Sequence, residues 1–313
     1  MNCLITGGAG FIGSNLSDKL LRLGYKVVCV DNLNDYYSPE TKKRNIESSL
    51  SNKNFRFYKV DIEDKEKLRD IFKGIDIVIH LAARAGVRAS FAEPEQYFNT
   101  NVIGTMNILE LCRENKAKLI FGSSSSVYGE NKIPFSDDSS AEEQLSPYGT
   151  TKRIAERLCE MYSKLYGLKV IVLRFFSVYG PRARPDLATY LFVKNILGGK
   201  KINMFGDGTS KRDYTYVDDV VDGIIAAIKN DLNFEIINIG DSNPVMLKDF
   251  ISIIENITRK KAIIERLPEQ RGDMKLTYAD ISKAKRLLGY KPKIPVEQGM
   301  KNFIEWYRKN AKE

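Results

Sequence analysis

A tyrosine and a lysine four residues apart, Tyr148 and Lys152, are the side chains of this sequence best suited to acid–base chemistry. Pro147 is typical of the first position of a helix, and a helix that begins there places both side chains on one face. A free phenol has a pKa of about 10, and a nearby ammonium lowers that pKa towards neutral pH. The pair therefore predicts a general base. Alone, the spacing is more typical of a solvated helix face, so the prediction depends on the rest of the chain.

A glycine-rich segment near the N-terminus predicts binding of a dinucleotide. The apolar run Cys3–Thr6 leads into Gly7, Gly10 and Gly13, and leucines at helical spacing follow. Although the spacing is Gly-x-x-Gly-x-x-Gly rather than Gly-x-Gly-x-x-Gly, it allows a pyrophosphate to approach the backbone at the N-terminus of a helix. Asp31, which ends the second apolar run, can accept hydrogen bonds from a ribose 2′-hydroxyl and would repel a 2′-phosphate. We therefore expect NAD rather than NADP.

Short apolar runs alternate with helical periodicity through the first half of the chain. Such runs suit strands that are buried on both faces of a parallel sheet covered by helices. The predicted fold class is therefore α/β, with a doubly wound parallel sheet of the Rossmann type. The predicted strands are Cys3–Thr6, Val27–Val30, Phe55–Val60, Ile75–Leu81, Leu119–Phe121 and Leu168–Leu173.

The residues that close the third and fourth predicted strands are placed to meet the same ligand. Asp61 and Ile62 would lie near the adenine. Leu81, Ala82 and Ala83 would lie near the ribose and the nicotinamide, although small residues at this point are also typical of close packing.

Four consecutive serines, Ser123–Ser126, end the fifth predicted strand. The carboxyl ends of parallel strands are where ligands bind in open sheets. A solvated turn would explain the serines equally well if Tyr148 and Lys152 did not follow. Because they follow at a distance that allows all three to converge, we expect Ser124 in the site.

The composition is that of an ordinary soluble protein: 313 residues, 43% hydrophobic and 28% charged. The formal charge of +9 could indicate nucleic-acid binding, but the basic residues are dispersed and form no basic helix interleaved with aromatic residues. A polyanionic small molecule such as a sugar nucleotide, or simply a lysine-rich surface, explains the charge as well. We therefore expect no nucleic-acid partner.

The cysteines and the single histidine favour a reducing compartment and no metal. Cys3, Cys29, Cys112 and Cys159 form no Cys-x-x-Cys pair and lie in apolar surroundings, so we expect buried free thiols. His80 alone cannot supply a zinc site of the usual spacing. The sequence carries no basic leader and no apolar run of membrane-spanning length, so we expect a cytoplasmic protein with no membrane partner.

The glycine segment, Ser124 and the Tyr148–Lys152 pair together resemble the extended short-chain dehydrogenase/reductase family, in particular its NAD-dependent nucleotide-sugar epimerases and dehydratases. The resemblance covers the whole chain. It implies a Rossmann domain of residues 1–176 and 213–241 and a smaller nucleotide-sugar-binding domain of residues 177–212 and 242–313. Further segments similar to the family are Arg174–Pro181, Gly206–Gly208, Arg212–Asp219 and Asn238–Gly240.

The resemblance implies a role for each residue of the predicted base. Tyr148 would remove the proton from the C4 hydroxyl of the sugar while a hydride passes to the nicotinamide of NAD. Lys152 would bind the nicotinamide ribose and lower the pKa of Tyr148, and Ser124 would hydrogen-bond the same sugar oxygen. The cofactor-binding residues implied are Gly7, Gly10, Phe11, Ile12, Gly13, Asp31, Asn32, Asp61, Ile62, Leu81, Ala82, Ala83, Asn101, Tyr148, Lys152 and Phe175.

The residues after Ser124 favour an epimerase within that family. Dehydratases typically carry Asp-Glu at the two following positions, and decarboxylases of UDP-glucuronate carry Glu at the second. Here the two positions are Ser125 and Ser126, and neither is an acid. The resemblance therefore implies a 4-epimerase that regenerates NAD in each cycle.

The segment Val178–Ala188 is similar to that of UDP-glucuronate 4-epimerases, in which the arginine matching Arg184 binds the sugar carboxylate. Ser177 and Leu187 depart from the usual Thr and Met, and an ion pair within the loop is another explanation of Arg184. The substrate-binding residues implied are Arg88, Ser125, Ser126, Ser177, Arg184, Phe205, Arg212, Arg271 and Asp273.

Other substrates and functions remain open from the sequence. A 4-epimerase of UDP-glucose or of a UDP-N-acetylhexosamine would carry the same core residues, and a catalytically idle NAD-binding regulator is a further alternative. The family also suggests a homodimer formed by the helices expected over Glu95–Asn115 and Tyr148–Tyr166, although an apolar helix stripe is more often part of the core.

Overall fold

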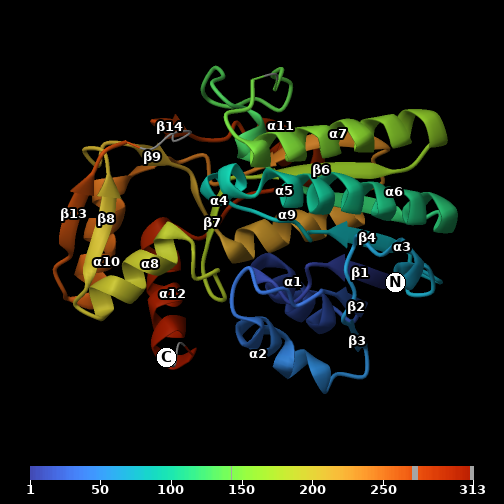
Figure 1. Cartoon of the computed structure of the whole chain (residues 1–313), viewed down its shortest axis with the longest axis horizontal. Helices are drawn as coiled ribbons and strands as arrows, with labels where there is room; N and C mark the ends of the chain where they lie inside the picture. Colours follow the sequence, from blue (N-terminus) through green and yellow to red (C-terminus); the bar gives the residue numbers. More distant parts are fainter. Residues whose placement is uncertain (142, 270–273, 311–313) are drawn as a thin grey trace.

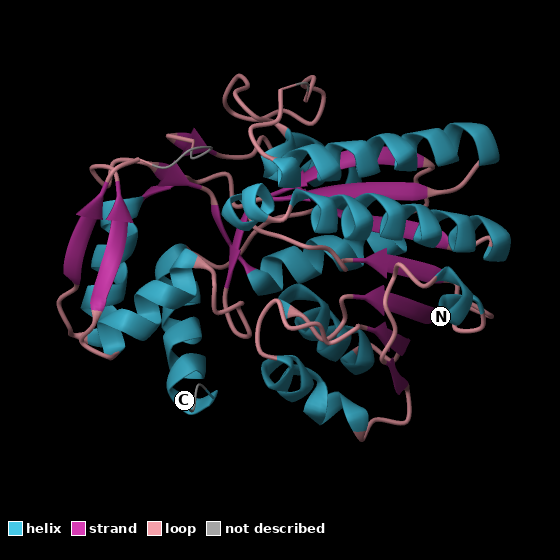
Figure 2. Cartoon of the chain, viewed as in Figure 1, coloured by secondary structure: helices cyan, strands magenta, loops and turns pink. Residues whose placement is uncertain are grey.

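The computed structural model describes residues 1–141, 143–269 and 274–310. The larger part of the molecule is a parallel sheet between two layers of helices (Figure 1). A smaller lobe of helices and short strands stands beyond the carboxyl ends of the sheet strands (Figure 2). The two parts therefore meet at the edge of the sheet where ligands bind in folds of this kind.

The central sheet confirms the predicted doubly wound fold. Its seven strands run parallel in the order β11-β6-β5-β4-β1-β2-β3, so the direction of winding reverses between β1 and β4. A ligand is expected at this reversal, outside the carboxyl ends of the strands. The strands are β1 (Asn2–Thr6), β2 (Lys26–Val30), β3 (Phe55–Tyr58), β4 (Ile77–His80), β5 (Lys118–Ser124), β6 (Val170–Phe175) and β11 (Phe234–Ile239).

Successive side chains of each strand point to opposite faces, and this alternation builds two hydrophobic clusters. On β1, Ile5 belongs to one cluster and its neighbour Leu4 to the other. The first cluster is covered by α1 (Phe11–Arg22), α2 (Pro39–Leu50) and α9 (Val217–Lys229). The second is covered by α3 (Lys65–Arg69), α6 (Gly104–Asn115) and α7 (Pro147–Tyr166).

Strands β5 and β6 extend past the ends that the sequence predicted. In β5, Gly122 pairs with Leu173, Ser123 with Arg174 and Ser124 with Phe175, although the apolar run stops at Phe121. The hydrogen bonds of the neighbouring strand hold these residues extended, whatever their side chains. The serine run therefore begins inside the sheet.

The helix expected over Glu95–Asn115 is present without a break, but it contains a π-helical turn. It consists of α5 (Pro94–Phe98), the π-helical turn η1 (Asn99–Ile103) and α6, and the short helix α4 (Val87–Ala92) precedes it. Such turns insert an extra residue and often lie at functional sites. A short 3₁₀ turn, η2 (Ser125–Val127), follows β5, and α11 (Ser282–Leu288) packs beside α9 and β11.

Among the described residues, the smaller lobe is built from short strands and three helices. The chain enters it through strand β7 (Ser177–Tyr179), directly after β6, and β7 pairs with β10 (Tyr214–Tyr216), which leads back to the large lobe. The other elements of the lobe are α8 (Ala188–Leu197), β8 (Lys201–Phe205), β9 (Lys211–Arg212), β12 (Val245–Met246), α10 (Leu247–Thr258), β13 (Ile263–Leu267), β14 (Leu276–Thr277) and α12 (Val296–Asn310).

One buried carboxylate holds together the segments that connect the two lobes. Asp213 is fully buried and accepts hydrogen bonds from the backbone N–H groups of Asp241 at 2.7 Å, Ser242 at 3.0 Å and Ala279 at 3.0 Å. These groups lie far apart in the sequence, so Asp213 fixes the place where the chain crosses between lobes.

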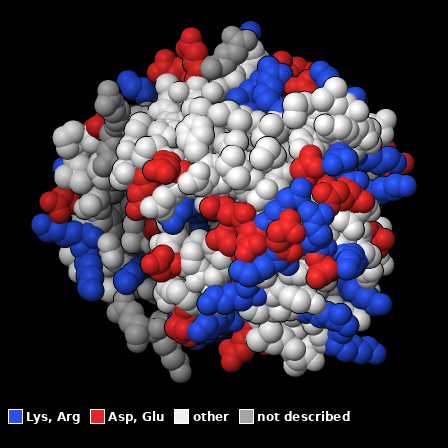
Figure 3. All heavy atoms as spheres, turned by 45° about the vertical axis from the view of Figure 1, so that its right-hand side comes forward, with Lys and Arg blue, Asp and Glu red and all other residues white. Residues whose placement is uncertain are grey.

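Charges of both signs are interspersed on the face of the molecule shown in Figure 3. The acidic residue Glu114, for example, pairs with both Lys65 and Arg69. In the described part of the chain, no helix is long and apolar enough to cross a membrane. The four cysteines are free and buried, as the sequence predicted.

Candidate active site

A cavity of about 900 Å³ opens at the carboxyl ends of the sheet strands, between the two lobes. It brings together residues predicted for both cofactor and substrate. From the large lobe, its lining includes Gly7, Gly10, Phe11, Ile12, Gly13, Asp31, Asn32, Asp61, Ile62, Leu81, Ala82, Ala83, Ser124, Tyr148, Lys152 and Phe175. The predicted substrate residues in its lining are Arg88, Ser125, Ser126, Ser177, Arg184, Phe205 and Arg212.

The glycine turn between β1 and α1 is too crowded for any larger residue. Gly7 has a φ of +67°, and a Cβ placed there would lie 2.8 Å from the backbone nitrogen of Ala82. At Gly13 a Cβ would lie 2.4 Å from the carbonyl oxygen of Gly7. No described side chain caps the N-terminus of α1, and the first residues of this helix, Phe11, Ile12 and Gly13, line the cavity. This geometry fits the diphosphate of a dinucleotide.

Asp31 is buried directly after β2 and lines the cavity. Its carboxylate accepts hydrogen bonds from the N–H groups of Ala9 at 3.2 Å and Leu33 at 2.9 Å. Burial raises the pKa of Asp31, and the charge of Lys42 opposes that rise. Lys42 is itself buried, and its ammonium donates to Asn34 Oδ1 at 2.6 Å. Lys42 therefore places a cation beside the carboxylate of Asp31, which is predicted to bind the ribose.

Asn101 differs from the other residues predicted to bind the cofactor, because it does not line the cavity. It is buried in the π-helical turn, where its Oδ1 accepts from Arg84 N at 2.8 Å and its Nδ2 donates to Arg84 O at 2.9 Å. Nδ2 also donates to Thr151 Oγ1 at 3.0 Å. In this structure Asn101 therefore connects the loop after β4 to helix α7.

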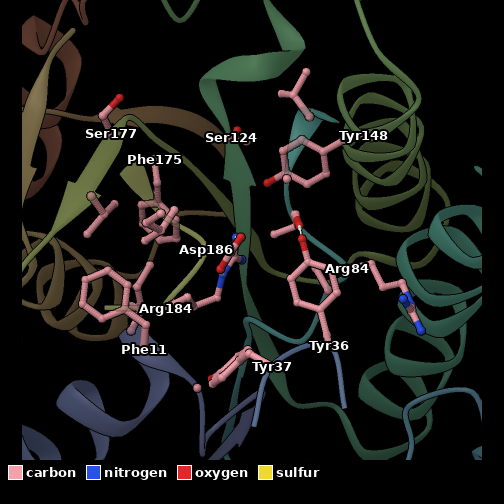
Figure 4. Close-up of a pocket in the computed structure, with 18 of the residues that line it drawn as sticks. Phe11, Tyr36, Tyr37, Arg84, Ser124, Tyr148, Phe175, Ser177, Arg184 and Asp186 are labelled. Carbon is pink, nitrogen blue, oxygen red and sulfur yellow. Dashed lines mark hydrogen bonds and ion pairs between the residues drawn. The ribbon is translucent and has the colours of Figure 1, made fainter. Parts of the chain in front are cut away.

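Helix α7 begins where the sequence predicted and carries Tyr148 into the cavity. Ser146 Oγ accepts a hydrogen bond from Gly149 N at 3.1 Å, a cap typical of a helix N-terminus. In Figure 4 the phenol oxygen of Tyr148 points towards Ser124 at the end of β5. The predicted convergence of these two side chains is therefore present.

The electrostatics of Tyr148 differ from the prediction. Burial raises the pKa of Tyr148, and a hydrogen bond with Ser124 and the charge of Arg184 only partly oppose that rise. Lys152 is not the dominant cation, because its ammonium turns to donate to Gly122 O at 2.7 Å. Burial also lowers the pKa of Lys152 to about 8. In this structure desolvation of the site outweighs the attraction between the two groups.

The serines of the run Ser123–Ser126 form hydrogen bonds with different parts of the structure. Ser124 Oγ donates to Ser126 Oγ at 3.2 Å and accepts from Ser126 N at 3.2 Å, which fixes the turn η2. Ser123 Oγ donates instead to the buried carboxylate of Glu156 at 2.6 Å. Glu156 lies one turn beyond Lys152 on α7 and also accepts from Arg174 of β6 at 2.8 Å.

The loop after β7 carries Arg184 into the cavity, but Asp186 holds the guanidinium. Arg184 Nε donates to one carboxylate oxygen at 3.0 Å and Nη2 to the other at 2.8 Å. The guanidinium also lies over the ring of Tyr36, 5.5 Å from its centre. Figure 4 shows this pair between Tyr148 and Tyr37. The ion pair within the loop, which was the alternative explanation of Arg184, is therefore present, and Arg184 also lines the cavity.

Several residues that the sequence analysis did not single out also shape the cavity. Tyr36 and Tyr97 both donate to the carbonyl oxygen of Ala85, which fixes the loop after β4. Tyr37 and Thr189 line the cavity, and both have buried hydroxyl oxygens with no hydrogen-bond partner among the described residues. The tyrosines of the Asp35-Tyr36-Tyr37 segment, close behind Asp31, were a signal that could have been used.

Two predicted substrate residues, Arg271 and Asp273, lie outside the described residues. Among the described residues no group of three or more His, Cys, Asp or Glu side chains could hold a metal ion. His80 is buried between the hydroxyls of Thr6 at 2.6 Å and Thr105 at 3.0 Å. Burial lowers the pKa of His80 to about 3, so the ring is neutral.

Comparison with known proteins identifies the family. Residues 3–240 match the model of the NAD dependent epimerase/dehydratase family. The chain belongs to that family. The resemblance inferred from the sequence is thereby confirmed. NAD is the cofactor that the family's name gives.

Members of the epimerase/dehydratase family with assigned activities are similar over nearly the whole chain. The UDP-glucuronate 4-epimerase of Thermodesulfobacterium geofontis is 45% identical over 98% of this chain and 96% of its own length. The crystal structure of UDP-glucuronic acid 4-epimerase from Bacillus cereus, in complex with UDP-glucuronic acid and NAD, is 39% identical with a TM-score of 0.95 and covers 99% of both chains. A UDP-glucose 4-epimerase from Thermotoga maritima with UDP-glucose is 37% identical, with a TM-score of 0.92 over 100% of both chains.

Proposed function

We propose that this protein is an NAD-dependent UDP-glucuronate 4-epimerase, which interconverts UDP-glucuronate and UDP-galacturonate. The observation that carries the proposal is one cavity containing Ser124, Tyr148 and Lys152 together with the guanidinium of Arg184. The first three suit oxidation of a carbinol, and the fourth suits a substrate with a carboxylate. The names of the relatives in Thermodesulfobacterium and Bacillus support the same reaction.

The chemistry at C4 of the sugar is assigned to three residues. When bound, NAD supplies the acceptor and later the donor of the C4 hydride. Tyr148 takes the proton of the C4 hydroxyl and returns it when the sugar is reduced again on its other face. Ser124 donates a hydrogen bond to the same oxygen, and the positive charge of Arg184 and, more weakly, that of Lys152 favour the phenolate. The buried phenol needs this help, because burial alone raises the pKa of Tyr148.

The sugar carboxylate is assigned to Arg184. Asp186 already takes Nε and Nη2 of the guanidinium, so a substrate carboxylate would meet Nη1 or displace Asp186. The hydroxyls of Ser125, Ser126 and Ser177 line the same cavity and can donate to the carboxylate as well.

Holding the carboxylate also protects the substrate from decarboxylation. Oxidation at C4 makes a β-keto acid, which loses CO2 when the carboxylate bond lines up with the carbonyl π system. Hydrogen bonds from Arg184 and the serines would oppose that alignment. Neither Ser125 nor Ser126 is an acid that could protonate the resulting enolate.

The first turn of α8 fits the negative charge of a sugar nucleotide. Asp186, Leu187, Ala188 and Thr189 all line the cavity, and no described side chain caps the helix. The uncapped N–H groups and the buried Thr189 hydroxyl are donors that face the substrate side of the cavity. An anionic substrate would accept hydrogen bonds from both the N–H groups and the hydroxyl.

We propose a role for the arrangement of the lobes as well. Residues 1–176 and 213–241 form the NAD-binding domain, and residues 177–212 and 242–313 form the domain that binds the nucleotide sugar. Two copies would associate through the exposed apolar side chains of α6 and α7, which include Met106, Met161 and Leu165. We propose that the protein acts in the cytoplasm.

A second candidate function is 4-epimerisation of UDP-glucose. The similarity to the UDP-glucose 4-epimerase of Thermotoga maritima favours it, and so does the ion pair between Arg184 and Asp186, which already neutralises the guanidinium. A UDP-N-acetylhexosamine is the other neutral substrate to compare.

The test is turnover of the purified protein with UDP-glucuronate, UDP-glucose and UDP-N-acetylglucosamine, followed by NMR of the anomeric proton. We expect UDP-glucuronate to have the highest kcat/KM and UDP-galacturonate to be its main product. Preference for UDP-glucose would support the second candidate, and a pentose nucleotide as the main product would reject epimerisation. Binding of NAD with no turnover of any of these sugars would instead support a catalytically idle NAD-binding regulator.

A further inference from the structure

The phenol oxygen of Tyr37 is a buried donor that lacks a partner in the cavity. None of the described residues forms a hydrogen bond with this oxygen, although it is shielded from solvent. A buried hydroxyl without a partner costs free energy, so its persistence in a binding cavity indicates that a ligand supplies the acceptor. Figure 4 shows the ring of Tyr37 lying below Arg184 in the cavity.

The position of the hydroxyl indicates which part of a ligand it meets. A Cβ built on Gly10 would lie 3.8 Å from Tyr37 Oη, so the phenol stands about one atom's width from the glycine turn. Gly10 immediately precedes the first residue of α1, and both Gly10 and the first turn of this uncapped helix line the same cavity. The hydroxyl and the helix N-terminus therefore converge on one site.

The surroundings keep Tyr37 protonated and its ring in place. Burial and the charge of Asp31 raise the pKa of Tyr37, so the hydroxyl remains a donor at neutral pH. The ammonium of Lys42 lies over the ring, 4.8 Å from its centre, and is anchored by Asn34 Oδ1 at 2.6 Å. The phenol is thus held towards the turn before any ligand binds.

We propose that Tyr37 Oη donates a hydrogen bond to the diphosphate of NAD. A non-bridging phosphate oxygen at the glycine turn would give the buried hydroxyl a charged acceptor opposite the N–H groups of α1. The proposal rests on NAD as the cofactor, as in the proposed function, but not on which sugar the enzyme converts.

The test compares the nucleotide affinities of the wild-type apoprotein and the Tyr37→Phe variant by titration calorimetry. We expect the variant to bind NAD and ADP-ribose about 10- to 100-fold more weakly, because a hydrogen bond to a charged group is lost. Binding of adenosine, which has no phosphate, and of UDP should be unchanged. Wild-type affinity for NAD, or an equal loss with adenosine, would overturn the assignment.

A matched control separates a ligand contact from a structural one. Tyr128 is fully buried, but its hydroxyl donates to Asn238 Oδ1 at 2.7 Å and the residue lies outside the cavity lining. Tyr128→Phe should lower the melting temperature of the apoprotein and leave NAD affinity unchanged. Tyr37→Phe should weaken NAD binding and leave the melting temperature of the apoprotein unchanged. A comparable loss of apoprotein stability in both variants would assign Tyr37 a structural role. Because no sugar is used, the outcome is independent of the substrate assignment.

Discussion

At the scale of single residues, the guanidinium of Arg184 sets the preference that we propose for a uronate. We expect Arg184→Ala to lower kcat/KM for UDP-glucuronate by about 10- to 100-fold, because a charge-assisted hydrogen bond to the carboxylate is lost. The kcat/KM for UDP-glucose should fall far less, because that sugar has no carboxylate. The measurement is the ratio of kcat/KM for the two substrates.

Arg182 provides the matched control, because it belongs to the same loop but pairs with Asp18 of α1 at 2.8 Å and does not line the cavity. Arg182→Ala should leave the ratio of the two substrates unchanged. A wild-type ratio in Arg184→Ala would show that the carboxylate is bound elsewhere.

The lowered pKa of Lys152 gives a second prediction at this scale. Burial lowers that pKa to about 8, so the ammonium loses its proton as the pH rises through 8 and no longer favours the phenolate of Tyr148. We expect kcat/KM for the sugar to fall above about pH 8. In Lys152→Arg the guanidinium stays charged, so the fall should move to higher pH even if the rate is lower. An unchanged alkaline limb in this variant would contradict the assignment.

At the scale of elements, helix α7 connects the proposed base to a buried ion pair. Tyr148, Lys152 and Glu156 are spaced by four residues and therefore share one face of the helix. Glu156 accepts two hydrogen bonds from Arg174 of β6, at 2.8 and 2.7 Å, and both residues are 1% exposed. Because Ser123 of β5 joins the same carboxylate, the pair fixes α7 against the two strands beneath the site.

Removing one partner of that pair should be costly. Glu156→Ala leaves the guanidinium of Arg174 buried without its counter-charge, and we expect the free energy of unfolding to fall by about 3–5 kcal/mol. Glu160→Ala, on the same helix, removes ion pairs with the exposed Arg157 and Lys164 and should cost no more than about 1 kcal/mol. Denaturant unfolding of the two variants measures the difference. Equal decreases in the free energy of unfolding would show that the buried pair stabilises the fold no more than the exposed pairs do.

The elements that the sequence predicted well are those with a strong local pattern. The apolar strands, the glycine turn and the Pro147 start of α7 depend on neighbouring residues, so their positions were predictable. The π-helical turn at Asn101 was not, because such a turn inside a continuous helix leaves no mark on the apolar pattern.

The parts of the site that were missed depend on tertiary contacts. Tyr36 and Tyr37 lie in an irregular segment with no periodicity, and only the fold brings them to the cavity. The turn of Lys152 towards Gly122, which changes the electrostatics of Tyr148, depends on the packing of α7 against β5. Spacing along the chain predicted which residues converge but not which neighbour each would contact.

At the scale of the whole molecule, α6 and α7 present an apolar surface that we propose as a dimer interface. Leu165 of α7 is 66% exposed. We expect the wild-type protein to sediment at twice the 35.6 kDa of one chain, and Leu165→Lys to sediment as a monomer because a charge cannot be buried there without a partner.

Leu23, at the end of α1, is an exposed leucine away from these helices and serves as the control. Leu23→Lys should keep the mass of the wild type. A monomeric wild type, or a Leu165→Lys variant of unchanged mass, would contradict the proposed interface.

At the scale of the whole molecule, the two lobes together hold the cofactor and the sugar in the proposed reaction. The hydride leaves C4 of the sugar and returns to the same carbon, so each cycle is redox-neutral. Incubation of the NAD-loaded protein with UDP-glucuronate that carries deuterium at C4 follows this cycle directly. We expect UDP-galacturonate that retains deuterium at C4, with no accumulation of NADH, as read by NMR and by absorbance. Loss of the deuterium to solvent, or product formation without a requirement for NAD, would contradict the account.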